Sequence, residues 1–281
     1  MLKQRVITAL LLLLLLLPAL FYQKPEPFYV LTLVFIAAAG WEWARMNGLG
    51  MAASLAAGWV CILGCSGFWW AGLLSQALPR LWLIVGCAWV LLSAWALRSG
   101  VAAWASYPRP LRLVLGLGAL CLTWLAMGQA RLIGTNFLLS ILALVWAADI
   151  GAYFSGRALG GRFTRSKLAV SISPGKSWEG VWGGMFGVVV LAFGWRWVDL
   201  TYATTVPSWY THIGARGFVY LLIAVIFMAA MSVVGDLIES LVKRSAGVKD
   251  SSALLPGHGG VLDRVDAILP TLPLAMMLYS Y

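Results

Sequence analysis

Charged side chains gather in the stretch PGHGGVLDRVD, residues 256–266, although the chain around it is strongly apolar. Asp263 and Asp266 are three residues apart at the start of an apolar segment, so on a helix they share one face. Adjacent carboxylates repel each other unless a cation or a proton lies between them. Mg²⁺ is usually held by one or two carboxylates together with substrate phosphates. The spacing therefore predicts a metal face, against the simpler alternative of an acidic helix N-terminus.

A second polar group ends an apolar segment in GDLIESLVKRSAGVKD, residues 235–250. Four of its polar residues are three or four positions apart and share one helix face: Asp236, Glu239, Ser240 and Lys243. A solvated helix end would explain Lys243 and Arg244, but it explains Asp236 poorly, because apolar residues flank that carboxylate. We therefore expect this face to border a functional site at the membrane interface.

Asp149 lies inside an apolar segment, LVWAADIGAYFSGRALGGR. A carboxylate within the membrane is costly, and such residues usually serve a site. The alternative is a hydrogen bond or an ion pair between helices that only stabilises the fold. We expect Asp149 to complete a polar cavity.

The segment SISPGKSWEG, residues 171–180, has the features of a turn before a helix. Its proline–glycine pair favours the turn, Ser177 can cap the helix, and Glu179 lies in the first helical turn. Backbone N–H groups at a helix start, joined by Lys176, could bind an anion. A plain capped turn is an equally good interpretation, and the spacing is not that of a P-loop.

Apolar helices must position these residues. The 281-residue chain is 62% hydrophobic and 11% charged, and it contains 16 tryptophans, which is typical of an all-α polytopic membrane protein. Candidate spans of membrane-crossing length lie near 6–22, 28–44, 51–70, 81–97, 111–130, 135–154, 180–198, 217–239 and 266–281. The sequence thus predicts about nine transmembrane helices, with a cytoplasm-facing polar cavity in the C-terminal half.

Acidic residues divide the chain into two regions. Glu26 and Glu42 are the only ones before Asp149. Residues 1–134, with about five helices, are therefore expected to be a transmembrane scaffold, and residues 135–281 the catalytic region. Gly183 and Gly187 form a GxxxG step, for which packing within the monomer is favoured over contact between two copies; a homodimer is the alternative.

Lysines and arginines set the expected orientation. The loop 155–179 contains Arg157, Arg162, Arg165, Lys167 and Lys176, and the loop 240–265 contains Lys243, Arg244, Lys249 and Arg264. The positive-inside rule places both loops in the cytoplasm. The net charge of +10 is explained by such loops and by attraction to anionic lipid, so nucleic acid is not an expected partner.

The run SLVKRSAGVKDSSALLPGHGGVLDRVD, residues 240–266, resembles the C-terminal motif of the phosphatidate cytidylyltransferases, or CDP-diacylglycerol synthases. The pattern S-x-x-K-R-x4-K-D…P-x-H-G-G-x-x-D-R-x-D is intact in it. ADIGAYFSGRALG and SPGKSWEG also resemble blocks of that family, although Ser177 stands where the family pattern has threonine. The resemblance covers at least residues 145–266.

This resemblance implies a Mg²⁺-dependent nucleotidyltransferase of phospholipid biosynthesis. It would transfer CMP from CTP to phosphatidic acid, giving CDP-diacylglycerol and pyrophosphate, in a bacterial-type cytoplasmic (inner) membrane with the site facing the cytoplasm. The partners would be CTP, phosphatidic acid and membrane lipids. The metal would be held by Asp236, Asp263 and Asp266, with a second cation as an alternative.

The remaining site residues follow from the same resemblance. The residues expected to act in catalysis are Asp263, Asp266, Lys249, Lys243, Arg264 and His258. Those expected to bind substrate are Asp149, Ser173, Lys176, Ser177, Glu179, Ser240, Arg244, Asp250, Gly259 and Gly260. His258 could bind pyrophosphate or only shape the glycine loop.

Two rival functions fit the sequence less well. A secondary transporter for an anion would also use Asp149, but it should have inverted repeats and polar residues in several spans, which are not evident here. A CDP-alcohol phosphotransferase would need the pattern D-G-x2-A-R…G-x3-D-x3-D, which is absent.

Overall fold

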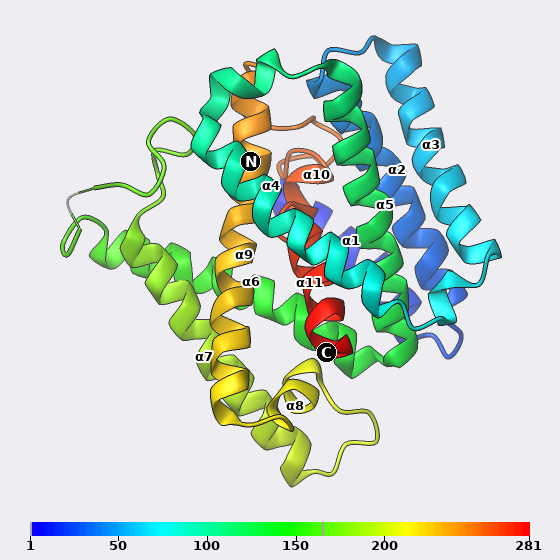
Figure 1. Cartoon of the computed structure of the whole chain (residues 1–281), viewed down its shortest axis with the longest axis vertical. Coiled ribbons are helices and arrows are strands. Elements are labelled where there is room, and N and C mark those ends of the chain that lie inside the picture. Colours follow the sequence, from blue (N-terminus) through cyan, green and yellow to red (C-terminus); the bar gives the residue numbers. More distant parts are fainter. Residues whose placement is uncertain (1, 165) are drawn as a thin grey trace.

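The protein, seen in a computed structural model that describes residues 2–164 and 166–281, is built from helices (Figure 1). Arg165 of the expected cytoplasmic loop lies outside the described residues. Within these described residues, seven helices are long and apolar enough to cross a membrane: α2 (Glu26–Met46), α3 (Met51–Trp70), α4 (Pro79–Ser106), α5 (Arg109–Ile133), α6 (Thr135–Leu159), α7 (Trp178–Thr201) and α9 (Phe218–Ser245). The predicted class, an all-α polytopic membrane protein, is confirmed.

The other helices are shorter or less apolar. They are α1 (Leu2–Phe21), the 3₁₀ turn η1 (Leu73–Ser75), α8 (Trp209–Gly214), α10 (Leu262–Val265) and α11 (Ile268–Ser280). Of the nine expected spans, the first therefore corresponds to α1, whose apolar part is Val6–Phe21, and the last to α11. A helix of 13 residues is about 20 Å long, which is less than the roughly 30 Å of hydrocarbon in a bilayer.

Helix α11 is short because it begins inside the protein. Its side chains Leu272, Leu274 and Ala275 are fully buried, and Figure 1 shows α10 and α11 in the centre of the bundle. Non-helical backbone at membrane depth is tolerated where protein surrounds it. The segment before α11 can therefore carry polar residues into the bundle, which an apolar span of full length could not do.

Helices α6 and α7 pack against each other through glycines. A Cβ on Gly184 would lie 2.7 Å from the carbonyl oxygen of Ala148, and one on Gly187 would lie 3.4 Å from that of Ala147. On Gly183 it would collide with Ser155. The GxxxG step thus lets α7 approach α6 closely, and the predicted packing within the monomer is confirmed.

The loops that carry the predicted site lie at one end of the molecule (Figure 1). The loop 160–177 contacts the end of α9, from which the loop 246–261 continues, since Arg244 Nε donates to the carbonyl oxygen of Ile172 over 3.4 Å. The connection 202–217 with α8 lies at the opposite end. This arrangement agrees with the expected placement of 155–179 and 240–265 on one side.

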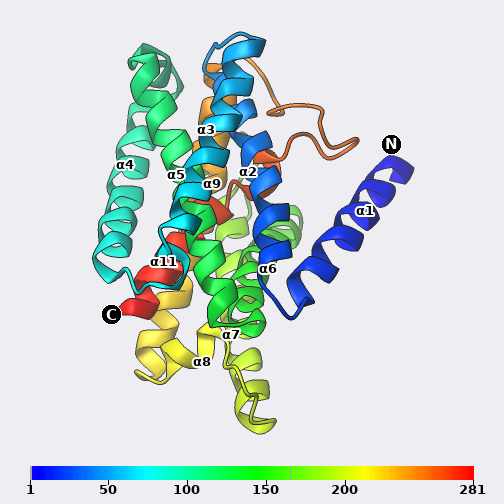
Figure 2. The ribbon, with the colours of Figure 1, turned by 90° about the vertical axis from the view of Figure 1, so that its right-hand side faces the viewer.

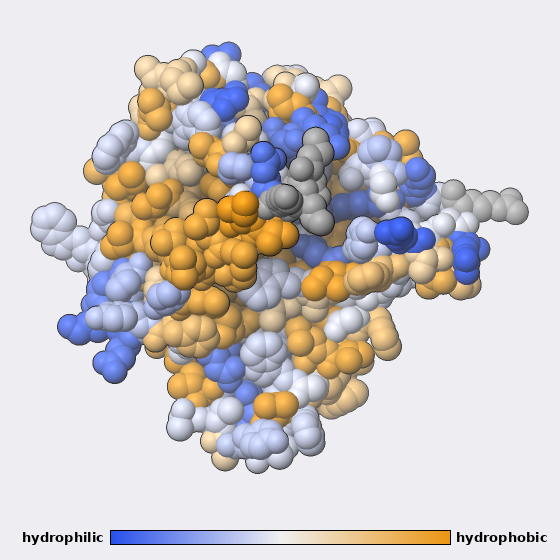
Figure 3. Space-filling view, turned by 180° about the vertical axis from the view of Figure 1, so that it is seen from behind, coloured by the Kyte–Doolittle hydropathy of each residue, from blue (hydrophilic) through white to orange (hydrophobic). Residues whose placement is uncertain are grey.

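Helix α1 leans away from the bundle, and the loop 246–261 reaches across to it (Figure 2). Thr8 Oγ1 donates to the carbonyl oxygen of Pro256 over 2.9 Å. Leucines of α1 such as Leu10 and Leu14 are exposed in the protein alone. Large hydrophobic areas reach the surface in Figure 3, as expected of helices that face lipid.

Candidate active site at the C-terminal end of α9

The C-terminal turns of α9 present the polar face that the sequence predicts. Asp236 Oδ2 forms an ion pair with Lys176 Nζ at 2.6 Å, and Ser240 Oγ donates to Asp236 Oδ1 over 3.3 Å. Lys176 comes from the loop before α7, so this ion pair joins two segments of the predicted site. One turn further on, Lys243 contacts Glu239 and Asp263.

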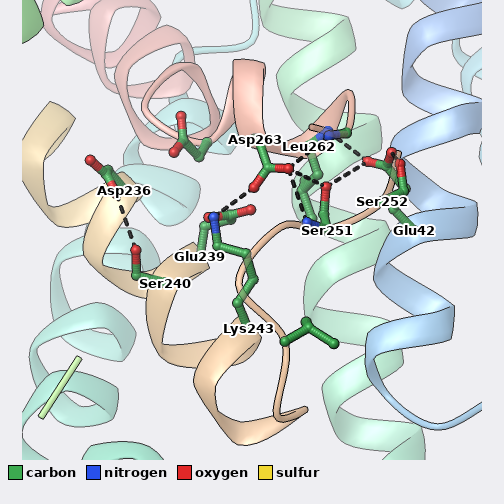
Figure 4. Close-up of polar contacts among 12 residues, drawn as sticks. Glu42, Asp236, Glu239, Ser240, Lys243, Ser251, Ser252, Leu262 and Asp263 are labelled. Atoms are coloured by element: carbon green, nitrogen blue, oxygen red, sulfur yellow. Dashed lines mark hydrogen bonds and ion pairs between the residues drawn. The ribbon is translucent and has the colours of Figure 1, made fainter. Parts of the chain in front are cut away.

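Asp263 is held by donors from two segments, α9 and the loop that follows it (Figure 4). Its Oδ1 lies 2.6 Å from Lys243 Nζ. Its Oδ2 accepts from Ser251 N at 2.9 Å and from Gly260 N at 2.8 Å. Burial alone would raise the pKa of Asp263, but hydrogen bonds with Glu239 and Lys243 and from these N–H groups lower it to about 2. Asp263 is therefore a carboxylate at every physiological pH.

Asp149, Asp236 and Asp266 form a second acidic group. Asp149 and Asp266 both lie within electrostatic reach of Asp236. A Cβ on Gly235 would lie 2.6 Å from the carbonyl oxygen of Asp266, so glycine is needed for this approach. Lys176 and Arg264 are the cations in reach of Asp149.

A three-ligand metal site is not preformed by the His, Cys, Asp and Glu side chains of the described residues. Asp263 and Asp266, expected to share one metal face, have different hydrogen-bond partners: Asp266 Oδ1 accepts from Ala267 N, whereas the oxygens of Asp263 accept from the groups named above. The oxygens of Asp236 and Asp266 still suit a cation that arrives with substrate phosphates. The metal role of the three aspartates stays a prediction.

The turn before α7 has the predicted cap. Ser177 Oγ accepts from Gly180 N over 3.2 Å. Glu179, expected to bind substrate, is 3% exposed, and its Oε1 accepts from the backbone N–H groups of Phe163 and Thr164. Its contacts therefore position the loop 160–177. Ser173 takes part in the same loop through backbone hydrogen bonds with Ala169 and Lys176.

Several predicted residues surround this centre without a fixed contact to the carboxylates. Lys249, Asp250 and Arg264 are exposed, as expected of groups that meet a soluble substrate. His258 lies between Gly257 and Gly259, which have φ of 78° and 82°, and its N–H donates to the carbonyl oxygen of Leu255. Its Nδ1 is buried without a hydrogen-bond partner among the described residues.

The glycines of the loop are required by close packing. A Cβ on Gly259 would lie 2.7 Å from Asp263 Oδ2, and one on Gly260 would lie 2.0 Å from Ser251 Oγ. Both contacts are too short for any other residue without movement of the loop. Gly259 and Gly260, predicted to bind substrate, thus bring the backbone close to the protein's own side chains, and their contact with substrate stays a prediction.

Glu42 is a site residue that sequence reasoning missed. It lies on α2, is fully buried, and accepts hydrogen bonds from the segment 251–262. A signal for it was present, because a carboxylate inside an apolar helix usually has a partner. Its partners are distant in the chain, so no spacing pattern pointed to them.

An apolar cleft opens beside the polar cluster. It has a volume of about 450 Å³ and is bordered by α4, α5 and α9. Trp89, Leu92 and Leu122 are among its apolar lining residues, and Glu239 and Leu262 lie at its border with the cluster. The site thus combines a charged end with an apolar end.

Comparisons with known proteins point to one family. A model of the "Cytidylyltransferase family" matches residues 3–281. A phosphatidate cytidylyltransferase of Haemophilus influenzae is 37% identical, covering 100% of this chain and 99% of the relative. One of Pseudomonas aeruginosa is 35% identical over 97% and 95% of the two chains, and one of Brucella melitensis is 33% identical over 94% and 80%. The chain belongs to the cytidylyltransferase family.

Proposed function

We propose that the protein is a phosphatidate cytidylyltransferase, which transfers CMP from CTP to phosphatidic acid and releases pyrophosphate. Relatives of that name match nearly its whole length. The observation that carries the proposal is that the polar cluster and the apolar cleft share Glu239 and Leu262. A phospholipid substrate needs such a junction, because its phosphate and its acyl chains must be bound side by side.

The reaction forms one P–O bond and breaks another. An oxygen of the phosphatidate phosphate attacks the α-phosphorus of CTP, and the bond between that phosphorus and the β-phosphate oxygen breaks, so CDP-diacylglycerol forms and pyrophosphate leaves. Lys176 and Arg264 neutralise phosphate charge. A phosphate monoester is largely ionised at pH 7, so the chain need not supply a strong base.

Asp236 and Asp266 are the residues proposed to hold Mg²⁺, with Asp149 beside them. Their oxygen ligands suit this ion, which usually completes its coordination with substrate phosphates and water. When bound, Mg²⁺ supplies charge neutralisation at the transferred phosphorus. Both oxygens of Asp236 and of Asp263 already have partners. Asp236 would therefore exchange Lys176 for the cation, and Asp263 would join the ligands only by exchanging Lys243.

The site is proposed to face the cytoplasm from a bacterial inner membrane. Its support is the positive charge of the loops 155–179 and 240–265 and their meeting at one end of the molecule.

The test is product formation by the purified protein in detergent micelles. CTP, phosphatidic acid and Mg²⁺ should give CDP-diacylglycerol, whereas diacylglycerol in place of phosphatidic acid should give none. EDTA should abolish turnover, and added Mg²⁺ should restore it. Wild-type protein that makes no product with all three components present would refute the proposal.

A further inference from the structure

The carboxylate of Glu42 joins the N-terminal region to the loop of the active site (Figure 4). Its Oε1 accepts from Ser252 Oγ and, at 3.0 Å, from Val261 N. Its Oε2 accepts from Leu262 N at 2.7 Å and lies 3.2 Å from Ser251 Oγ. All of these donors belong to residues 251–262, which we call the anchored loop.

Because Glu42 is buried, its hydrogen bonds and the conformation of the anchored loop depend on each other. Glu42 is 0% exposed, and a carboxylate removed from water is costly unless donors surround it. Two of its donors are backbone N–H groups, so they reach the carboxylate only when residues 261 and 262 take the observed path. Glu42 and the anchored loop therefore fix each other.

The same loop also holds Asp263, through donors next to those that hold Glu42. Gly260 N donates to Asp263, and the next two N–H groups, those of Val261 and Leu262, donate to Glu42. Ser251 Oγ also lies 2.9 Å from Asp263 Oδ2; its single hydroxyl proton can serve one of the two carboxylates at a time. Movement of the loop away from Glu42 would thus displace the donors of Asp263.

We propose that Glu42 is a positioning residue for cytidylyl transfer. It touches no substrate; it fixes the anchored loop and through it the position of Asp263 and its partner Lys243. This inference rests on the proposed function, and it gives the N-terminal region a part in turnover beyond support.

The diagnostic variant is Glu42→Gln, which keeps the size of the side chain. One end of the amide would turn N–H groups toward the donors of the anchored loop, and donors facing donors lose their hydrogen bonds. We expect kcat to fall by on the order of 10- to 100-fold, because small misplacements at a reacting centre have effects of this size. The KM for phosphatidic acid should stay within about twofold, since Glu42 is fully buried and its oxygens are occupied by donors of the anchored loop.

Asp199→Asn is the matched control. Asp199 is 4% exposed and also accepts from a backbone N–H and from side chains, namely Ser208 N, Thr211 Oγ1 and Asn136 Nδ2. It lies in the last turns of α7, at the opposite end of the molecule. A purely structural loss should lower the midpoint of thermal unfolding in both variants, but only Glu42→Gln should lower kcat.

A spin label attached to the cysteine of Ala253→Cys reports the mobility of the anchored loop without any assay of activity. Ala253 is exposed, and replacing Cys87 by serine removes the one exposed thiol, since Cys61, Cys65 and Cys121 are buried. In the full chain, Glu42→Gln should give a more mobile electron paramagnetic resonance spectrum than wild type, and Asp199→Asn should not.

A second variant covers the case in which Glu42→Gln does not fold. Ser252→Ala removes one donor of Glu42 and leaves both carboxylates in place, so it should lower kcat by about threefold to tenfold and increase label mobility. An unchanged spectrum, or a kcat equal to that of the Asp199→Asn control, would overturn the inference. Inactive wild type would instead refute the proposed function, and the spectra alone would still decide whether Glu42 fixes the loop.

Discussion

Asp236 and Asp263 are both site carboxylates, but they are held differently. Asp236 makes one ion pair and accepts from one hydroxyl, and its side chain is 35% exposed. Asp263 is 5% exposed and accepts from Lys243 and from two backbone N–H groups of the anchored loop. Substituting each by asparagine should therefore separate an effect on catalysis from an effect on folding.

Asp236→Asn should lower kcat by at least about 100-fold, because the amide lacks the charge that a cation and the Lys176 ammonium require. Its stability should change by no more than about 1 kcal/mol, as for other partly exposed ion pairs. Steady-state kinetics and thermal unfolding measure the two effects. Glu26→Gln, at an exposed acidic residue in the first turn of α2, is the control and should stay active; full activity of Asp236→Asn would refute its role.

Asp263→Asn should lose activity and also stability, by about 1–3 kcal/mol, because the new amide leaves buried donors without an acceptor. The folded pKa of Asp263 is lowered to about 2. Its stabilising effect is therefore complete above the unfolded pKa near 3.9 and is lost as the pH falls through 2. The loss of stability caused by Asp263→Asn should thus be larger at about pH 5 than at about pH 2, and an equal loss at both pH values would contradict the assigned ionisation.

At the scale of elements, local patterns predicted the long helices well. The apolar segments near 51–70 and 135–154 correspond to α3 and α6, and the cap of Ser177 was read correctly, because apolar length and capping are properties of neighbouring residues. The depth of α11 and the contacts of Glu42 were not predicted. They depend on tertiary packing, and Glu42 meets Ser251 across 209 residues of sequence.

The spacing of Asp263 and Asp266 shows the same limit at the site. Two aspartates three residues apart predicted a shared cation. In the fold, donors brought by α9 and by the anchored loop surround Asp263, while Asp266 lies in reach of Asp236 and Asp149. The type of residue was informative from sequence, but the partner of each residue was set by segments that sequence spacing could not place.

Helix α4 provides a test of the apolar cleft. Ala88 lines the cleft, so Ala88→Trp should fill part of it and raise the KM for phosphatidic acid at least about fivefold. The KM for CTP should not change, because the nucleotide is bound by the polar cluster. Leu63→Trp on α3, where the residue is 69% exposed, is the control. Equal effects on both substrates would exclude the cleft as the acyl-chain site.

For the whole molecule, the two ends should be on opposite sides of the membrane. Ala253→Cys lies in the anchored loop, and Thr205→Cys lies in the connection before α8; both positions are exposed. Each cysteine is introduced into the protein in which serine replaces Cys87. In intact cells, a membrane-impermeant thiol reagent should label position 205 and should reach position 253 only after lysis. Labelling of position 253 from outside would reverse the proposed orientation.

The central claim is that this family member transfers the cytidylyl group of CTP to phosphatidic acid. The most direct measurement follows two labels in CTP, one on the α-phosphorus and one on the γ-phosphorus, when purified wild-type protein is mixed with phosphatidic acid and Mg²⁺. The account predicts that the α-label enters the lipid fraction and the γ-label is recovered in pyrophosphate. Absence of the α-label from the lipid, or transfer of the γ-label to it, would contradict the account.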